Sequence, residues 1–205
     1  MTQTVKRGGN QNHPETGSLI KVEPIRRIED IKAIKRLLAD RPRDLALFTV
    51  GINTNLRASD LLQITVGQVR GLKPMDEIEL RERKTGKLRR ISLNRACVEA
   101  INVWLAVRPK PKKMEDEDIL FTGQRGPLEV GTVHKLVKSW CKAINLKGNY
   151  GSHSLRKSFG YHQRVTFGVG LPELMTIFNH STQRQTLAYL CVQPDEVKSV
   201  YENQL

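Results

Sequence analysis

The 205-residue sequence is short of cysteine, aromatic residues and long apolar runs. Its three cysteines, Cys97, Cys141 and Cys191, are widely spaced and form no C-x-x-C pair, which indicates neither a disulfide framework nor a zinc site. No stretch approaches the roughly 20 apolar residues that cross a bilayer, and the N-terminus lacks the apolar segment of a signal peptide. These absences predict a cytoplasmic protein whose cysteines are reduced packing residues.

Negative charge is also scarce, because 34 Lys and Arg stand against 21 Asp and Glu and leave a net charge of +13. A magnitude of about 2 to 8 is enough to keep a small domain soluble. The excess lies in residues 1–113, which hold 24 basic and 12 acidic residues. Such a surplus predicts a polyanionic partner, and nucleic acid fits best because Lys and Arg neutralise its phosphates. An anionic membrane surface is the weaker alternative, since no helix pairs a basic face with a Trp/Phe face.

The apolar pattern predicts one mainly helical domain with a small antiparallel hairpin, an α+β fold. Residues 1–20 are polar and predict a flexible tail. Helical spacing predicts helices over 28–38 and 42–50, a turn over 51–56, and a third helix through Ile64. Alternation at 78–80 and 91–93 around Lys84-Thr85-Gly86-Lys87 predicts the hairpin. Further helices are expected over 98–105 and 130–140, and then several short ones separated near Gly168, His180 and Pro194.

His153 and Arg156 form the first candidate for chemistry. They follow a Gly/Asn turn within His153-Ser154-Leu155-Arg156, and a spacing of three places both on one helix face. Arginine presents a planar fork that matches phosphate oxygens, and histidine exchanges a proton near neutral pH, which together suit a phosphodiester reaction. The commoner explanation of such a pair is structural.

The second and third candidates are basic. Arg57 begins the third predicted helix, where backbone amides already favour an anion, although a surface ion pair with Asp60 is the simpler explanation. Around the single acid Glu82, the hairpin carries Arg81, Arg83, Lys84, Lys87, Arg89 and Arg90. A ribbon of this kind fits a DNA groove or backbone, but edge strands also carry lysine to prevent aggregation.

The fourth candidate is His180, which Tyr189 follows nine residues later. A tyrosine beside leucines is more often a packing residue than a nucleophile. Because a phenol has a pKa of about 10, catalysis by Tyr189 would need cationic neighbours or a base. Tyr150, Tyr161 and Tyr201 lack this spacing from His180.

Taken in order, these segments resemble the tyrosine recombinase (phage integrase) family over about residues 25–205. The matching pieces are Gly51–Leu62, with Asp60 where the family has Glu, then Lys84-Thr85-Gly86, His153–Ser158, and His180–Tyr189. The combination of H-x-L-R with H-x8-Y is specific to this family. Phe178-Asn179-His180 replaces the usual Leu-Gly-His, and asparagine tolerates the left-handed conformation that glycine supplies.

The resemblance implies site-specific DNA recombination (integration, excision or inversion). Tyr189 would attack a phosphodiester and leave a 3′-phosphotyrosyl bond and a free 5′-hydroxyl, without metal, ATP or another cofactor. Charge on the phosphorane would be stabilised by Arg57, Arg156 and His180. Lys84 would protonate the leaving oxygen and His153 would shuttle the proton of the tyrosine. Asp60 would support these groups, and the DNA contacts would come from Arg81, Arg83, Lys87, Arg89, Arg90 and Lys157.

The resemblance also implies double-stranded DNA as partner, a nucleoid-associated location, accessory DNA-bending proteins and a tetramer joined through residues 194–205. Most family members carry a further N-terminal DNA-binding domain, for which this chain has too few residues, so residues 21–205 are expected to form a catalytic domain alone, in a minimal recombinase or in a fragment. Two other functions stay open. One is a type IB topoisomerase, which typically has Lys in place of His153, and the other is a catalytically silent DNA-binding regulator.

Overall fold

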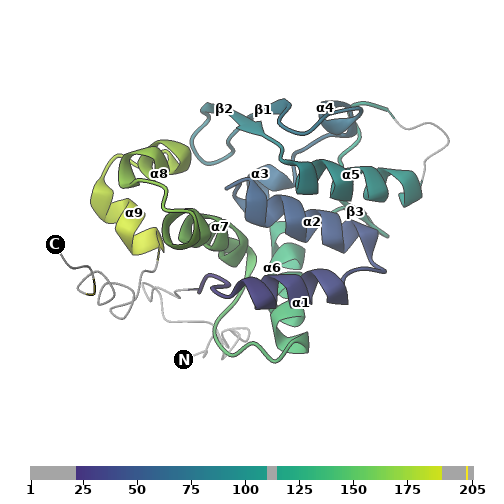
Figure 1. Ribbon diagram of the computed structural model, residues 1–205. Helices are drawn as coiled ribbons and strands as arrows, with labels where there is room; N and C mark the ends of the chain where they lie inside the picture. Colours follow the sequence, from purple (N-terminus) through teal and green to yellow (C-terminus); the bar gives the residue numbers. More distant parts are fainter. Residues whose placement is uncertain (1–21, 110–114, 191–201, 203–205) are drawn as a thin grey trace, which may run out of the picture.

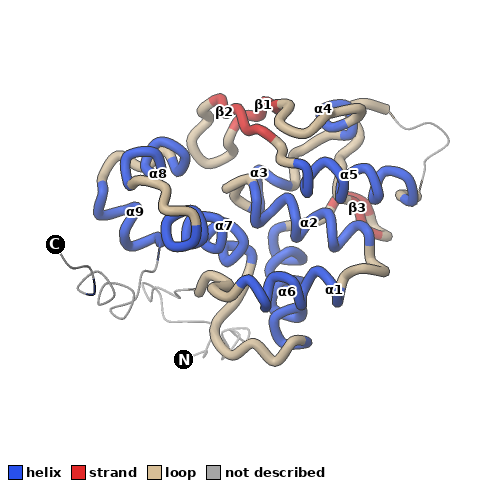
Figure 2. Tube along the Cα trace, in the orientation of Figure 1, coloured by secondary structure: helices blue, strands red, loops and turns tan. Residues whose placement is uncertain are grey.

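The structure is a computed structural model, and it describes residues 22–109, 115–190 and 202. Helices predominate, as the sequence predicts (Figure 2). In chain order the elements are α1 (Ile28–Leu37), α2 (Pro42–Asn53), α3 (Ala58–Leu61), α4 (Val66–Val69), β1 (Glu77–Arg81), β2 (Leu88–Ser92), α5 (Arg95–Val107), β3 (Thr122–Gly123), β4 (Gly126–Pro127), α6 (Val130–Ala143), α7 (Ser152–Tyr161), the π-helix η1 (His162–Thr166), α8 (Leu171–Phe178) and α9 (Gln183–Leu190).

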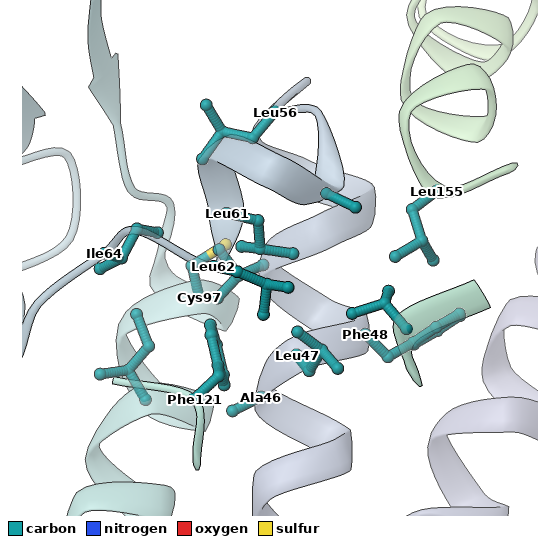
Figure 3. Close-up of a cluster of buried hydrophobic side chains, with 14 of the residues drawn as sticks. Ala46, Leu47, Phe48, Leu56, Leu61, Leu62, Ile64, Cys97, Phe121 and Leu155 are labelled. Carbon is teal, nitrogen blue, oxygen red and sulfur yellow. The ribbon is translucent and has the colours of Figure 1, made fainter. Parts of the chain in front are cut away.

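Helix α2 lies at the centre of the main core and packs against α5 and α7. Most of its residues are buried, as expected for a helix that is apolar on nearly all sides. Its Phe48 meets Trp140 of α6 edge to face, with ring centroids 5.8 Å apart. Figure 3 shows Leu155 of α7 in the same apolar cluster as Phe48 and Leu61, so this core joins the helices that carry several of the candidate residues.

The hairpin forms as predicted, with β1 and β2 antiparallel and Ile78 opposite Ile91. Ile78 and Leu80 face the core while the alternate residues of β1 are exposed, which is the pattern expected of a strand with one buried face. Gly86 closes the turn with φ of +68°, a conformation that costs glycine little. Residues 83–87 of the basic turn are all exposed.

The last helices form a small second core around Leu174, Phe178 and Leu190. In Figure 1, α8 and α9 lie beside α7, on the side of the molecule away from α5. The predicted breaks near Gly168 and His180 are confirmed, because η1 ends before the first and α8 ends before the second. A packing unit distinct from the main core thus carries His180 and Tyr189.

Two local predictions are wrong. The turn expected from Gly51 begins later, because α2 continues to Asn53. Gly51 is buried there against α7, and a Cβ on it would lie 2.6 Å from Leu155 Cδ1. The third helix ends at Leu61, and Ile64 lies beyond it, where its carbonyl accepts a hydrogen bond from the backbone of Leu120.

Several predictions fall outside the described residues: the tail over 1–20, Cys191, the break near Pro194 and the docking segment 194–205. Within the described residues, Cys97 and Cys141 are buried free thiols, which fits their expected packing role. The helices among those residues include none long and apolar enough to cross a membrane.

Candidate active site

The predicted residues come from separate elements. Contacts link Arg57, Arg156, His180 and Tyr189 around α7 and the α8–α9 pair, whereas Lys84 makes no recorded contact with them in the described structure. Arg57 is the N-cap of α3, and Lys84 lies exposed in the hairpin turn. His153 and Arg156 share α7, as the spacing predicts. His180 follows the end of α8, and Tyr189 lies on α9.

Aromatic contacts bring Tyr189 and His180 together. The ring of Phe178 stacks on His180 with centroids 5.2 Å apart, and the Tyr189 ring lies 5.0 Å from Phe178 and 5.6 Å from His180. Two cations flank the same tyrosine: the guanidinium carbon of Arg156 lies 5.7 Å from its ring centroid and Lys157 Nζ lies 5.5 Å from it. Tyr189 therefore has the cationic neighbours that a reactive phenol requires.

Arg156 is held rigidly in this cluster, with only 2% of its surface exposed. Its Nη1 donates to the carbonyl of Asn55 at 2.9 Å and its Nη2 to the carbonyl of Phe178 at 3.2 Å. Burial, together with nearby cations such as Arg57, lowers the pKa of Arg156 from 12.5 to about 10, so it stays charged at neutral pH. A guanidinium has five N–H donors, which leaves Arg156 capacity for a further acceptor.

The end of α8 is fixed by side chains from distant segments. The carbonyl of Ile177 accepts from Asn55 Nδ2 at 2.8 Å and from Arg89 Nη2 at 3.0 Å. These donors satisfy a carbonyl that a helix end leaves without an intrahelical partner, and the arginine also complements the negative end of the helix dipole. Asn179 then turns left-handed at φ of 55°, as expected, and the chain leads into His180.

Glu82 is the buried acid that gathers the arginines. It is 2% exposed, accepts from Thr85 Oγ1 at 2.7 Å and from Arg89 Nη1 at 3.0 Å, and pairs with Arg57 Nη1 at 2.9 Å. Burial alone would raise the pKa of Glu82, but the contacts with Thr85, Arg89 and Arg57 outweigh it and lower the pKa from 4.5 to about 2. Glu82 is therefore ionised at neutral pH. It links the hairpin to α3 and, through Arg89, to α8.

Asp60 is fully buried behind Arg57. Its Oδ1 accepts from the backbone N–H of Arg83 at 3.0 Å, while its Oδ2 lies 3.8 Å from Arg57 Nη1. Arg57 therefore does pair with Asp60, as the simpler explanation expects, but the pair is not at the surface, because Asp60 is fully buried. Arg57 is 19% exposed and its nearer carboxylate is Glu82.

His153 lies exposed near the start of α7. The pKa of His153 is lowered from 6.5, because neighbouring protein shields the ring and because Arg156 and Lys157 are close. Because its pKa is lowered, His153 is a largely neutral histidine at pH 7 and is able to accept a proton.

The start of α7 is packed closely against α6. Gly151, just before α7, lies directly against the ring of His134 from α6, and a Cβ at Gly151 would overlap that ring.

His180 is half-buried, and its Nδ1 lies 3.0 Å from Thr186 Oγ1 of α9. Burial lowers the pKa of His180 from 6.5, and the charges of Arg156 and Arg57 lower it further. The Thr186 contact fixes the ring orientation. When Thr186 donates to Nδ1, the proton of the neutral ring lies on Nε2.

The basic hairpin residues divide into two groups. Arg89 is turned inward, 12% exposed, with one donor on Glu82 and another on α8. The others lie on the surface, where Lys87 Nζ reaches Asn179 Oδ1 at 3.3 Å and Arg90 Nε reaches Glu79 Oε2 at 2.9 Å. The remaining exposed members are Arg81, Arg83 and Lys84.

Sequence reasoning missed the residues that organise the site. Asn55, Phe178 and Thr186 lie within or beside the segments that carry the resemblance, but the sequence assigned them no role, because their roles depend on tertiary contacts. Glu82 had one signal, its position as a lone acid among six bases. In the part of the chain that the structure describes, His, Cys, Asp and Glu side chains form no group of three that could hold a metal ion.

Comparison with solved structures shows that this mainly helical domain has the fold of tyrosine recombinase catalytic domains. The solved XerA recombinase superposes with a TM-score of 0.71 at 17% identity, over 91% of this chain and 65% of that one. The catalytic domain of bacteriophage HP1 integrase superposes with a TM-score of 0.57 at 19% identity, over 89% of this chain and 95% of that one.

Sequence comparison supports the same assignment. The model of the phage integrase family matches residues 26–196. The probable integrase/recombinase YoeC of Bacillus subtilis is 32% identical over 186 residues, 88% of this chain and 96% of that protein. Tyrosine recombinase XerC of Caldanaerobacter subterraneus is 32% identical over 160 residues, 77% of this chain and 44% of that protein. The chain belongs to the phage integrase family, whose members are tyrosine-type site-specific recombinases.

Proposed function

We propose that this chain cuts and rejoins DNA at specific sites through a 3′-phosphotyrosyl bond to Tyr189. The observation that carries the proposal is the placement of the Tyr189 ring beside both Arg156, at 5.7 Å, and His180, at 5.6 Å. Cations next to a phenol favour its ionised form, which is the nucleophile. Arg156, as a cation, and His180, as a neutral N–H donor, would stabilise negative charge on a phosphate that approaches Tyr189.

The other roles follow from charge and proton state. Arg57, Arg156 and His180 would bind the non-bridging oxygens as the phosphorane forms, and Nε2–H of His180 is a suitable donor when Thr186 holds Nδ1. His153, whose pKa is lowered, would accept the proton of the tyrosine. Lys84, exposed in the hairpin turn, would protonate the leaving 5′-oxygen once DNA lies against the hairpin.

In this proposal Glu82 acts as a positioning residue. It touches no DNA, because it is buried, but it holds Arg57 directly and it holds Arg89, which in turn binds the end of α8 before His180. A fixed carboxylate between the two arginines offsets their mutual repulsion and sets where the Arg57 guanidinium lies. Asp60 would add a longer contact to the same Nη1 of Arg57, at 3.8 Å.

The partner in this proposal is double-stranded DNA. XerH was solved bound to its difH substrate and Tn1549 integrase with circular intermediate DNA. This chain spans about half of XerH and 44% of the Caldanaerobacter XerC, so activity, substrate and assembly of a whole protein are part of our proposal. A tetramer joined through residues 194–205, DNA-bending accessory proteins and a location at the nucleoid remain predictions.

Covalent trapping tests the proposal. Wild type and Tyr189→Phe would be incubated with nicked suicide duplexes drawn from the DNA that flanks the gene. We expect a denaturant-resistant adduct with label at the 3′-phosphate from wild type only. Tyr150→Phe is the matched control, since Tyr150 is buried and its hydroxyl donates to the carbonyl of Lys147 at 3.3 Å, away from the cluster around Tyr189. It is expected to retain the adduct.

Relaxation and binding assays on the same proteins separate the two alternatives. Relaxation of supercoiled DNA without strand exchange would support a type IB topoisomerase. Sequence-specific binding with no adduct from wild type would support a silent regulator. An adduct that survives in Tyr189→Phe would refute the assignment of the nucleophile.

A further inference from the structure

A cavity of about 800 Å³ lies at the end of α2 remote from the candidate active site. Its walls come from the start of α2, the end of α5 and the β3 region, including Arg41, Arg43, Trp104, Arg108 and Thr122. Helix α2 has 12 residues, and at about 1.5 Å per residue it separates this cavity from the Arg57 side by roughly 18 Å. The cavity is thus distinct from the site that holds Tyr189.

Arg108 in the cavity wall is a buried charge without adequate compensation. It is 5% exposed, and its Nη2 donates to the carbonyl of Ile119 at 2.7 Å. Its Nε and Nη1 are buried and meet no acceptor among residues 22–109 and 115–190, and no carboxylate of those residues forms an ion pair with it. Because an unpaired buried cation is costly, this arrangement points to an anion that binds beside it.

The other charges of the cavity leave it positive. Arg43 is paired with buried Asp44, whose Oδ1 lies 2.7 Å from Arg43 Nη2. Arg41 is exposed and has no ion pair in the described structure, so Arg41 and Arg108 remain uncompensated. Arg41 is also the N-cap of α2 and makes no side-chain cap. Pro42 has no N–H, but the next amides of the first turn add to the attraction for an anion.

We propose that this cavity binds the phosphate group of a small phosphorylated molecule. Arginine forks match phosphate oxygens, and a helix N-terminus favours the same charge. A volume of about 800 Å³ is that of a pocket for an organic ligand, and Pro42, Trp104 and Pro109 supply apolar lining for the remainder of the molecule. The phosphates of a DNA duplex stay at the protein surface, whereas the guanidinium of Arg108 is buried. The depth of Arg108 below the surface therefore favours a small ligand over DNA.

Equilibrium dialysis with inorganic phosphate, AMP and adenosine tests this proposal on the full chain. We expect phosphate and AMP to bind and adenosine not to bind. Tighter binding of AMP than of phosphate would identify a phosphate ester as the ligand, and equal binding would identify free phosphate. Arg108→Gln and Arg41→Gln are each expected to weaken AMP binding by about tenfold or more, the effect of losing a charged hydrogen-bond donor.

Arg27→Gln is the matched control, since Arg27 is an exposed arginine near α1 and outside the cavity. It removes the same charge and should leave AMP binding unchanged. Because Arg108→Gln removes a buried contact, exposed Arg41 provides the variant that keeps the fold, and Arg41→Gln should still form the adduct at Tyr189. Absence of AMP binding by wild type, binding of adenosine as tight as AMP, or wild-type AMP affinity in Arg41→Gln and Arg108→Gln would each overturn the proposal.

Discussion

Replacing Glu82 by Gln removes the buried charge that pairs with both Arg57 and Arg89. The glutamine side chain keeps the size of glutamate and one acceptor oxygen. Its NH₂ group, however, would face the donor groups that now bind the second carboxylate oxygen. Arg89 would lose its carboxylate partner, and Arg57 would keep only the longer pair with Asp60, at 3.8 Å. We expect the variant to be less stable and to form the Tyr189 adduct more slowly, because Arg57 is displaced and the Arg89 link to α8 is loosened.

The folding free energy lost in Glu82→Gln can be worked out in two ways. Removing one partner of a buried ion pair costs about 3–5 kcal/mol. The lowering of the Glu82 pKa from 4.5 to about 2 corresponds to about 3 kcal/mol of folding free energy at neutral pH. Since the side chains of Arg57 and Arg89 are 19% and 12% exposed, water recovers part of this loss. We therefore expect a loss of about 2–4 kcal/mol for Glu82→Gln.

Urea denaturation and adduct formation on suicide duplexes at saturating DNA measure the two effects. Glu79→Gln is the control, because Glu79 lies on β1 three residues before Glu82 and pairs with Arg90, but both of these side chains are exposed. That change should cost less than about 1 kcal/mol. If Glu82→Gln matched Glu79→Gln in both stability and adduct rate, the positioning role of Glu82 would be refuted. Unchanged adduct rate with reduced stability would restrict Glu82 to a structural role.

The pH dependence provides a second check on Glu82. Its native pKa lies below the ordinary value, so its charge stabilises the fold fully above about pH 4.5, and this contribution is lost as pH falls towards 2. The difference in unfolding free energy between wild type and Glu82→Gln should be constant from pH 7 to 5 and shrink below pH 4.5. If the difference in unfolding free energy stayed constant down to pH 3, the lowered pKa would not belong to Glu82.

Three further outcomes are expected. Gly160→Ala would place a Cβ 2.5 Å from an aromatic carbon of Phe178 on α8 and so push α7 away from α8 and α9. It should lower the thermal midpoint of unfolding and slow adduct formation at least about tenfold. Gly131→Ala, which has open space around it, should do neither. Asn179→Gly should keep the wild-type free energy of unfolding in urea, whereas Asn179→Ala should lower it by about 1 kcal/mol, because residue 179 has a left-handed backbone conformation. Equal losses in the two variants would exclude backbone strain as the cause. Burial raises the pKa of the Cys97 and Cys141 thiols to about 12, so peptide mapping should find them unalkylated at pH 8 until urea unfolds the chain.

Local chemistry in the sequence determined the hairpin and the helix breaks. The alternation around Ile78 and Gly86 predicts two strands and a tight turn, and both are present. Asn179 in place of glycine predicts a left-handed helix end, which is also present. These features depend on residues within a few positions of one another, so a one-dimensional pattern contains them. The order of Arg57, Arg156, His180 and Tyr189 was likewise visible without coordinates.

Only the tertiary structure decided which charges are buried and what they touch. Glu82 stands out in the sequence only as a lone acid among six bases, which does not reveal its burial. In the structure Glu82 is enclosed by Arg57 and Arg89, whereas Glu79 faces water. Gly51 predicts a turn by composition, but packing against Leu155 keeps it helical. Burial and pairing arise from contacts between segments far apart in the chain, and these contacts, rather than residue type, set the pKa of Glu82 and the position of the Arg57 guanidinium.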